Sequence, residues 1–156
     1  MAHKPPPADW PQLSTCMFYR DAPAAIDWLC KAFGFEVRIR VDDDSDPGKI
    51  VHSELVYGKA LIMVDSRVAP DDPVPPGEEW RRTYASPLDL GGRGTQSLFM
   101  YVDDVDAHCA QARAHGARIV IEPKVSDYGP EYWSDRGYSA LDCEGHFWSF
   151  AHRLRG

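Results

Sequence analysis

Two side chains that could move a proton, His52 and Glu54, stand two positions apart in the largely apolar stretch 50–57. Residues two apart in a β-strand face the same side of a sheet, so an extended chain sets the imidazole beside the carboxylate. Apolar surroundings raise the pKa of a carboxyl group, and a neighbouring His can share its proton, as in general acid–base pairs. The spacing therefore predicts a candidate catalytic pair with Glu54 as the base.

The short turn 58–59 decides what lies across from this pair. Gly58-Lys59 suits a two-residue hairpin, which sets Glu54 opposite Met63 and His52 opposite Asp65 on the same face. The three polar side chains could then hold a metal ion of an unusual kind.

A structural role for the same residues remains an alternative. Glu54 could pair with Arg136 across a cavity, while His52 pairs with Asp65 at the open end of the hairpin, because buried polar groups are commonly tolerated as pairs. The other histidines have no convergent partners and are expected at the surface: His3, His108, His115 and His152.

The elements that must position these residues occur in the same order twice. Apolar periodicity and turn residues predict one helix and four strands in each half of the chain. In the first half these are strand 13–19, helix 21–33 and strands 35–41, 50–57 and 60–65. In the second half they are strand 96–102, helix 105–115 and strands 118–122, 137–141 and 146–152.

An internal duplication explains this order. Aligning Asp21 with Asp104 superposes strand on strand and helix on helix, and it brings Gly34 onto Gly116 with a slip of one residue. Two copies of one βαβββ unit are therefore predicted. The expected division is a tail at 1–11, a first module at 12–65, a connecting segment at 66–95 and a second module at 96–156.

The connecting segment 66–95 is rich in Pro and Gly and has no sustained period. A segment of this length is usually a lid, an interaction loop or a linker. Trp80, Tyr84 and Leu88 make it more apolar than a tether needs. Both a lid and a solvated linker remain open.

Composition limits the partners. The chain has 17 Lys and Arg against 24 Asp and Glu, a net charge of −7, which argues against nucleic acid or an anionic membrane surface as partner. No apolar run reaches the roughly 20 residues of a membrane span, and the first residues lack a signal-peptide core, so a cytoplasmic protein is expected. The scattered cysteines Cys16, Cys30, Cys109 and Cys143 are expected to be reduced thiols.

Three stretches carry a resemblance to a known family: RDAPAAIDWLCKAFGF at 20–35, DDVDA at 103–107 and DCEGHFWSF at 142–150. Together with the paired βαβββ units, they resemble the vicinal oxygen chelate superfamily, which includes glyoxalase I, extradiol dioxygenases and bleomycin-resistance proteins. The resemblance implies an α+β fold in which two tandem modules form a curved half-barrel sheet with the helices outside. It also implies a homodimer.

In the metal-using members of that superfamily, four His, Gln or Glu ligands come from the first and last strands of each unit. Transferring those positions onto this chain places Ser14, Met63, Ser97 and Ser149 there. Hydroxyl and thioether groups are poor ligands for a divalent ion. The resemblance therefore implies that neither a metal nor another cofactor is bound, unless a misalignment by one residue hides a true ligand.

Period-two alternation predicts what else faces the hollow. If the turn before the last strand has four residues, Tyr138 lies opposite Ser149 and Arg136 opposite Ala151, with Trp133 as a cap. The expected wall is then mainly aromatic: Phe18, Met63, Phe99, Tyr101, Tyr138 and Phe147. Such a wall suits a flat, partly apolar ligand held by stacking and a few hydrogen bonds.

The favoured function is metal-free binding of a small aromatic or heterocyclic molecule, such as the sequestration of an antibiotic. The alternative is an enzyme, namely a glyoxalase-type lyase, isomerase or epimerase that uses Glu54 as base, with or without an unusual metal site.

Overall fold

The computed structural model describes residues 10–156 and contains two βαβββ units in tandem. The first unit consists of β1 (Thr15–Tyr19), α1 (Ala22–Phe33), β2 (Glu36–Asp42), β3 (Ile50–Tyr57) and β4 (Ala60–Ser66). The second consists of β5 (Ser97–Tyr101), α2 (Val105–Ala114), β6 (Arg118–Asp127), β7 (Ser134–Leu141) and β8 (Phe147–Arg155). The predicted α+β architecture is confirmed.

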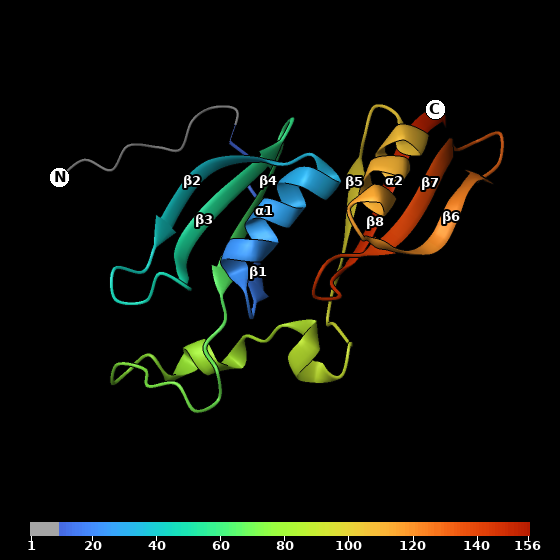
Figure 1. Ribbon diagram of the computed structural model, residues 1–156. Helices are drawn as coiled ribbons and strands as arrows, with labels where there is room; N and C mark the ends of the chain where they lie inside the picture. The colour runs from blue at the N-terminus through green and yellow to red at the C-terminus, as the bar shows by residue number, and fades with distance from the viewer. Residues whose placement is uncertain (1–9) are drawn as a thin grey trace.

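Each unit forms its own mixed, four-stranded sheet. The strand orders are β1-β4-β3-β2 and β5-β8-β7-β6, with β1 parallel to β4 and β5 parallel to β8. The two sheets lie side by side with β1 and β5 innermost, and α1 and α2 lie against one common side of the pair (Figure 1). The side chains on the opposite side of both sheets are therefore free to form a binding surface, called the concave face below.

The sequence of helix α1 determines where the helix begins and ends and which of its faces is buried. The Asp21 carboxylate caps its first turn by accepting a hydrogen bond from Ala24 N, and Gly34 ends it at a φ of 76°, which a residue with a Cβ rarely adopts. The helix buries an apolar face that includes Ile26 and Leu29. Phe33 at its end reaches the second module, where its ring centre lies 4.7 Å from that of Phe150. The core therefore joins the two modules through their helices.

The hairpin registers were predicted correctly in the first module only. Glu54 does lie opposite Met63. In the second module, Ser149 lies opposite Ser139 rather than Tyr138, because the turn comprises residues 142–146 and is one residue longer than predicted. Asp142 holds the longer turn, since one of its carboxylate oxygens accepts hydrogen bonds from three backbone N–H groups within it.

The connecting segment runs below both sheets and contains two short 3₁₀ helices, η1 (Glu79–Thr83) and η2 (Pro87–Leu90) (Figure 1). Within residues 10–156, neither helix has the length and apolarity that crossing a membrane requires.

Candidate functional site

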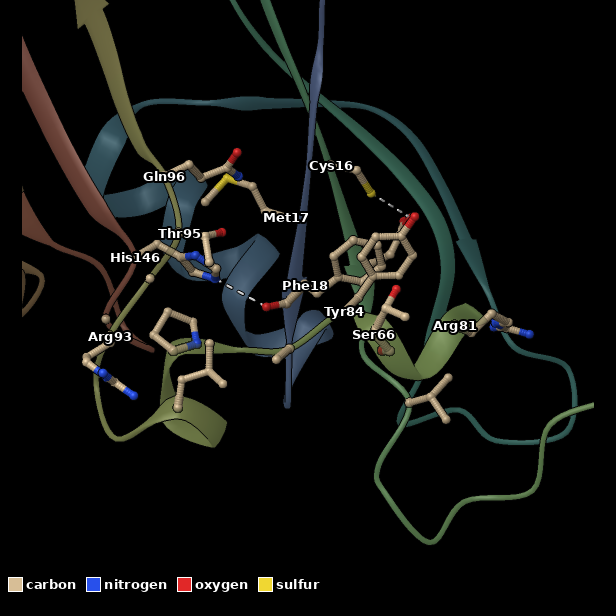
Figure 2. A pocket seen from close by; sticks show the side chains of 18 of the residues that line it. Cys16, Met17, Phe18, Ser66, Arg81, Tyr84, Arg93, Thr95, Gln96 and His146 are labelled. Carbon is tan, nitrogen blue, oxygen red and sulfur yellow. Dashed lines mark hydrogen bonds between the residues drawn. The ribbon is translucent and has the colours of Figure 1, made fainter. Parts of the chain in front are cut away.

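A cleft of about 960 Å³ lies where the connecting segment passes below the two modules. Its walls come from the end of β1, the end of β4, the segment itself and the start of β8. Figure 2 shows Phe18, Cys16, Tyr84 and Arg81 at one side of it and Arg93 at the other. Of the predicted wall residues, Phe18 and Phe147 line this cleft.

An aromatic stack forms one wall. Tyr84, from the connecting segment, lies flat on Phe18, with ring centres 4.1 Å apart and planes 5° from parallel. Trp80 stands edge-on to Tyr84 at 6.0 Å. The wall is therefore built partly by the segment, so residues 80 and 84 pack onto the first module and are not part of a fully solvated linker.

Two carboxylates fasten the end of the connecting segment to both modules. Glu144, in the turn before β8, accepts hydrogen bonds from Arg20 N at 2.8 Å, from Asp21 N at 2.9 Å and from the Ser86 hydroxyl. Asp89 accepts from the guanidinium groups of Arg20 and Arg67. One buried turn residue therefore joins the first module, the segment and the second module.

Cys16 and Asp65 form a polar pair in the cleft wall beside Phe18. The Cys16 thiol donates to the Asp65 carboxylate at 3.2 Å. Burial, together with the neighbouring Asp65 carboxylate, raises the pKa of Cys16 to about 12, so this sulfur is a protonated thiol at neutral pH and a poor nucleophile. Burial also raises the pKa of Asp65, against the hydrogen bonds it accepts from Cys16 and from Ser53 N.

Glu54 and His52 do lie together on the concave face, as predicted, and an unpredicted third residue joins them. Glu54 accepts from Arg38 at 2.7 Å and lies 3.2 Å from the His52 ring nitrogen. Burial would raise the pKa of Glu54, but the hydrogen bonds from Arg38 and His52 outweigh it and leave the pKa below its ordinary value. Glu54 is therefore ionised at neutral pH.

The structural pairing proposed for these residues is wrong in both parts. Arg136 pairs with Asp106, at the start of α2, through two hydrogen bonds of 2.7 Å, and so it lies on the helix side of its sheet. His52 pairs with Glu54 rather than with Asp65. The shifted register of β7 explains the first error, because it turns Arg136 away from the concave face.

Tyr138 is likewise buried in the core and not in the cavity wall. Only 2% of it is exposed, its ring is stacked on Phe150, and its hydroxyl lies 2.7 Å from the His108 ring. The prediction that His108 lies at the surface is also wrong, since it is buried between Tyr138 and the carbonyl oxygen of Phe33. Of the other histidines, His3 lies outside the described residues.

The positions expected to hold metal ligands in the superfamily are occupied by weak donors here. Ser149 exchanges a hydrogen bond of 2.9 Å with Ser139, and Met63 lies between Glu54 and Cys16 in its sheet. Ser97 is exposed at the start of β5, and the Ser14 oxygen is buried without a hydrogen-bond partner. Within residues 10–156, no three His, Cys, Asp or Glu side chains are grouped closely enough to hold a metal ion.

The second module presents its aromatic residues openly. Phe99 is 61% exposed and Tyr101 46% exposed, and both line a second depression of about 780 Å³ beside the β3–β4 turn. The Arg153 guanidinium lies 5.2 Å from the ring centres of both Tyr101 and Trp133 and is paired with Asp135. Of the predicted wall residues, Phe18 and Phe147 therefore line the cleft and Phe99 and Tyr101 line the second depression. Met63, Tyr138 and the predicted cap Trp133 line neither hollow.

The sequence interpretation missed Asp142 and Glu144, which hold the turn beside the cleft, and Tyr84, which stacks on Phe18 in its wall. It also missed Arg38, the partner of Glu54 outside the cleft. An Asp followed two residues later by Glu within a turn was the available signal for Asp142 and Glu144. Nothing in the sequence indicated that Tyr84 stacks on Phe18, because the two lie in different segments of the chain.

Comparisons with known proteins agree with this geometry. The profile of the Glyoxalase/Bleomycin resistance protein/Dioxygenase superfamily matches residues 12–150. The solved structure of TioX from Micromonospora sp. ML1 is 27% identical, with a TM-score of 0.64 over 91% of this chain and 98% of TioX. A glyoxalase/bleomycin resistance protein/dioxygenase family enzyme from Burkholderia phytofirmans PsJN is 20% identical, with a TM-score of 0.57 over 90% of this chain and 97% of that one.

A glyoxalase I mutant from Zea mays is 16% identical, with a TM-score of 0.64, and the match covers 90% of this chain but 44% of the plant chain. At 20% identity and below, the similarity is one of fold. A comparison with curated protein sequences found no significant match.

Proposed function

Because the chain belongs to the glyoxalase/bleomycin resistance protein/dioxygenase superfamily, we propose that it binds a small aromatic or heterocyclic molecule in the cleft beside β1, without a metal ion. The observation that carries this proposal is the aromatic wall of Phe18 and Tyr84 within a cleft of about 960 Å³. Cavities of several hundred Å³ with apolar walls and a few polar groups are typical of small-molecule sites. Sequestration of an antibiotic is the physiological role that fits such binding.

The metal of the metal-dependent superfamily members does not fit these residues. Serine hydroxyls and a thioether occupy the expected ligand positions, and the Ser149 hydroxyl is already hydrogen-bonded to Ser139. A divalent ion prefers imidazole, carboxylate or thiolate donors. The proposed binding therefore depends on stacking and hydrogen bonds alone.

Calorimetric titration with bleomycin and with planar bicyclic heteroaromatic compounds tests this proposal, with and without added Zn²⁺ or Ni²⁺. We expect binding that is independent of metal and is lost in Phe18→Ala. Phe99→Ala, on the open face, is the matched control and should retain binding. Binding that requires metal, or that survives Phe18→Ala and disappears in Phe99→Ala, would refute the proposed site.

A second candidate function rests on Glu54. This carboxylate is ionised, has 10% of its side chain exposed and lies beside His52, which could pass a proton on, whereas the ion pair with Arg38 lowers its basicity. The alternative activity is that of a glyoxalase-type lyase, isomerase or epimerase. Glu54→Gln should abolish turnover of a keto or thioester substrate while preserving its affinity if this alternative holds, and turnover unaffected by the change would exclude Glu54 as the base.

We also infer that the protein is a homodimer. Strand β2 is an edge strand that exposes Val37, Ile39 and Val41, and an uncovered apolar edge favours association. Light scattering coupled to size-exclusion chromatography should give about twice the monomer mass of 17.5 kDa, and a monomer at micromolar concentration would contradict the inference.

A further inference from the structure

The contact between Phe18 and Tyr84 leaves no room for a ligand ring. Their centres are 4.1 Å apart and their planes are nearly parallel, which is contact distance for two aromatic rings. A third ring inserted between them would need about twice that separation. A flat ligand therefore reaches Phe18 only when Tyr84 has left it.

Tyr84 belongs to a stretch that is weakly attached to the rest of the protein. We call residues 78–84 the gate segment; Tyr84 is 40% exposed and Trp80 is 56% exposed, and η1 contains no buried residue. Within the described chain, the side-chain hydrogen bonds of the gate segment stay inside residues 70–84. Few buried contacts and local hydrogen bonds are the features of a segment that opens at low cost.

The regions on both sides of the gate segment are, by contrast, fixed to the modules. Before it, Asp72 accepts a hydrogen bond of 3.0 Å from Lys49. After it, Ser86 is bonded to the buried Glu144, and Asp89 to Arg20 and Arg67. The gate segment can therefore move while its two ends remain in place, which is the arrangement of a hinged flap.

The surface that Tyr84 covers has a polar edge. Asp65 is the direct neighbour of Phe18 on the adjacent strand β4, and it faces the same side of the sheet. Its carboxylate accepts from the Cys16 thiol and from Ser53 N, one bond to each oxygen, so both oxygens retain accepting capacity. A ring lying on Phe18 that carries an N–H or O–H group would find an acceptor at this edge.

We propose that Tyr84 covers the face of Phe18 on which the ring of the ligand stacks, so that the ligand has to displace Tyr84. The ligand is a flat heteroaromatic molecule whose N–H group donates a hydrogen bond to Asp65. This inference rests on the proposed function and identifies the ligand class and the gate of the same cleft. The chain's net charge of −7 agrees with a neutral or cationic donor ligand.

The test uses benzimidazole, which has an N–H donor, and benzofuran, which has a similar shape and no donor. Affinities are measured by ligand-observed NMR for the wild-type protein, for Tyr84→Ala and for Tyr132→Ala. Tyr132 is an exposed tyrosine in the turn before β7, outside the cleft, and so provides the same substitution as a control. Removing the stacked competitor should tighten benzimidazole binding about three- to tenfold in Tyr84→Ala, with no change in Tyr132→Ala.

Weaker or unchanged binding in Tyr84→Ala, with binding by the wild type intact, would overturn the gate while leaving the proposed function in place. Absence of binding of either probe to all three proteins would overturn both.

The donor requirement is tested separately. Wild-type protein should bind benzimidazole more tightly than benzofuran, and Asp65→Asn should reduce that preference, since a neutral amide is a weaker acceptor than a carboxylate. If the wild-type protein binds the two probes with equal affinity, the role of Asp65 is overturned. This comparison needs no substituted protein, so it does not depend on whether Asp65→Asn folds.

Discussion

The two halves of the concave surface share one plan and have different surroundings. Phe18 on β1 and Tyr101 on β5 are equivalent under the internal duplication, as are Cys16 and Phe99. In the first module the stacking surface is covered by Tyr84 from the connecting segment, whereas Tyr101 remains 46% exposed beside the open Phe99. The difference shows that the duplication provides two similar hollows, and that the single connecting segment makes only one of them a covered cleft.

The hairpin turns of the two modules also differ, one being short and exposed and the other longer and buried. The β3–β4 turn is the short pair Gly58-Lys59, which is exposed. The corresponding β7–β8 turn is longer and buries Asp142 and Glu144, whose hydrogen bonds hold β1, α1 and the connecting segment together. The asymmetric cleft therefore depends on one buried turn, and the following substitutions test that dependence.

The largest effect is expected for Glu144→Ala. The substitution leaves the buried Ser86 hydroxyl and two partly buried backbone N–H groups without their acceptor, and the loss of these three hydrogen bonds should lower the free energy of unfolding by about 3 kcal/mol. Lys59→Ala, in the exposed turn of the first module, should change it by less than about 0.5 kcal/mol. Urea denaturation measures both, and a Glu144→Ala loss as small as that of Lys59→Ala would contradict the fastening role.

A smaller difference in the free energy of unfolding is expected between substitutions on the two aromatic surfaces. Phe18→Ala removes a half-buried ring together with its stack on Tyr84 and should lower the free energy of unfolding by about 2 kcal/mol. Phe99→Ala removes a ring that is 61% exposed and should change it by no more than about 0.5 kcal/mol. The same denaturation series decides the matter, and equal losses would mean that the connecting segment does not cover Phe18 in solution.

The smallest expected effect is on the pH dependence of the free energy of unfolding, and it involves His108 in the core beside α2. The duplication aligns His108 of α2 with Ala25 of α1, so only the second module buries a histidine at this position. Burial lowers the pKa of His108, and its ring donates from Nε2 to the Phe33 carbonyl oxygen while Nδ1 accepts from the Tyr138 hydroxyl. As the pH falls through about 6.5, His108 becomes protonated in the unfolded chain while it stays neutral in the folded protein. The free energy of unfolding should therefore fall as the pH decreases below about 6.5.

In His108→Gln the fall in unfolding free energy between pH 7.5 and pH 5.5 should be smaller than in the wild type. Thermal and urea unfolding at the two pH values supply the comparison. An identical pH dependence in both proteins would show that His108 does not contribute to it.

Much of the fold could be predicted because its signals are local. The strand and helix periods, the Asp21 and Asp104 caps and the helix-ending Gly34 each act within a few residues, and they placed most elements within two residues of their observed bounds. The last three strands are longer than predicted: β6 continues to Asp127, β7 begins at Ser134 and β8 continues to Arg155. The Gly58-Lys59 turn likewise fixed the register that sets Glu54 opposite Met63. The duplicated order followed from the same local signals.

The site was only partly predictable because its geometry depends on contacts between distant segments. A turn one residue longer than expected reversed the faces of Tyr138 and Arg136, since neighbouring residues in a strand point to opposite sides. The partner of Glu54 was Arg38, placed where the pairing of β2 with β3 is irregular, and no periodic pattern locates such an irregularity.

The amino-acid sequence by itself determined the two βαβββ units, the aromatic residues of β1 and β5, and the serines at positions 14, 97 and 149. Only the tertiary structure decided that Tyr84 lies on Phe18 and that Glu144 fastens the connecting segment. Hydrogen bonding and periodicity within one element are encoded by neighbouring residues, whereas the position of an irregular 30-residue segment depends on which distant side chains satisfy its polar groups and cover its rings.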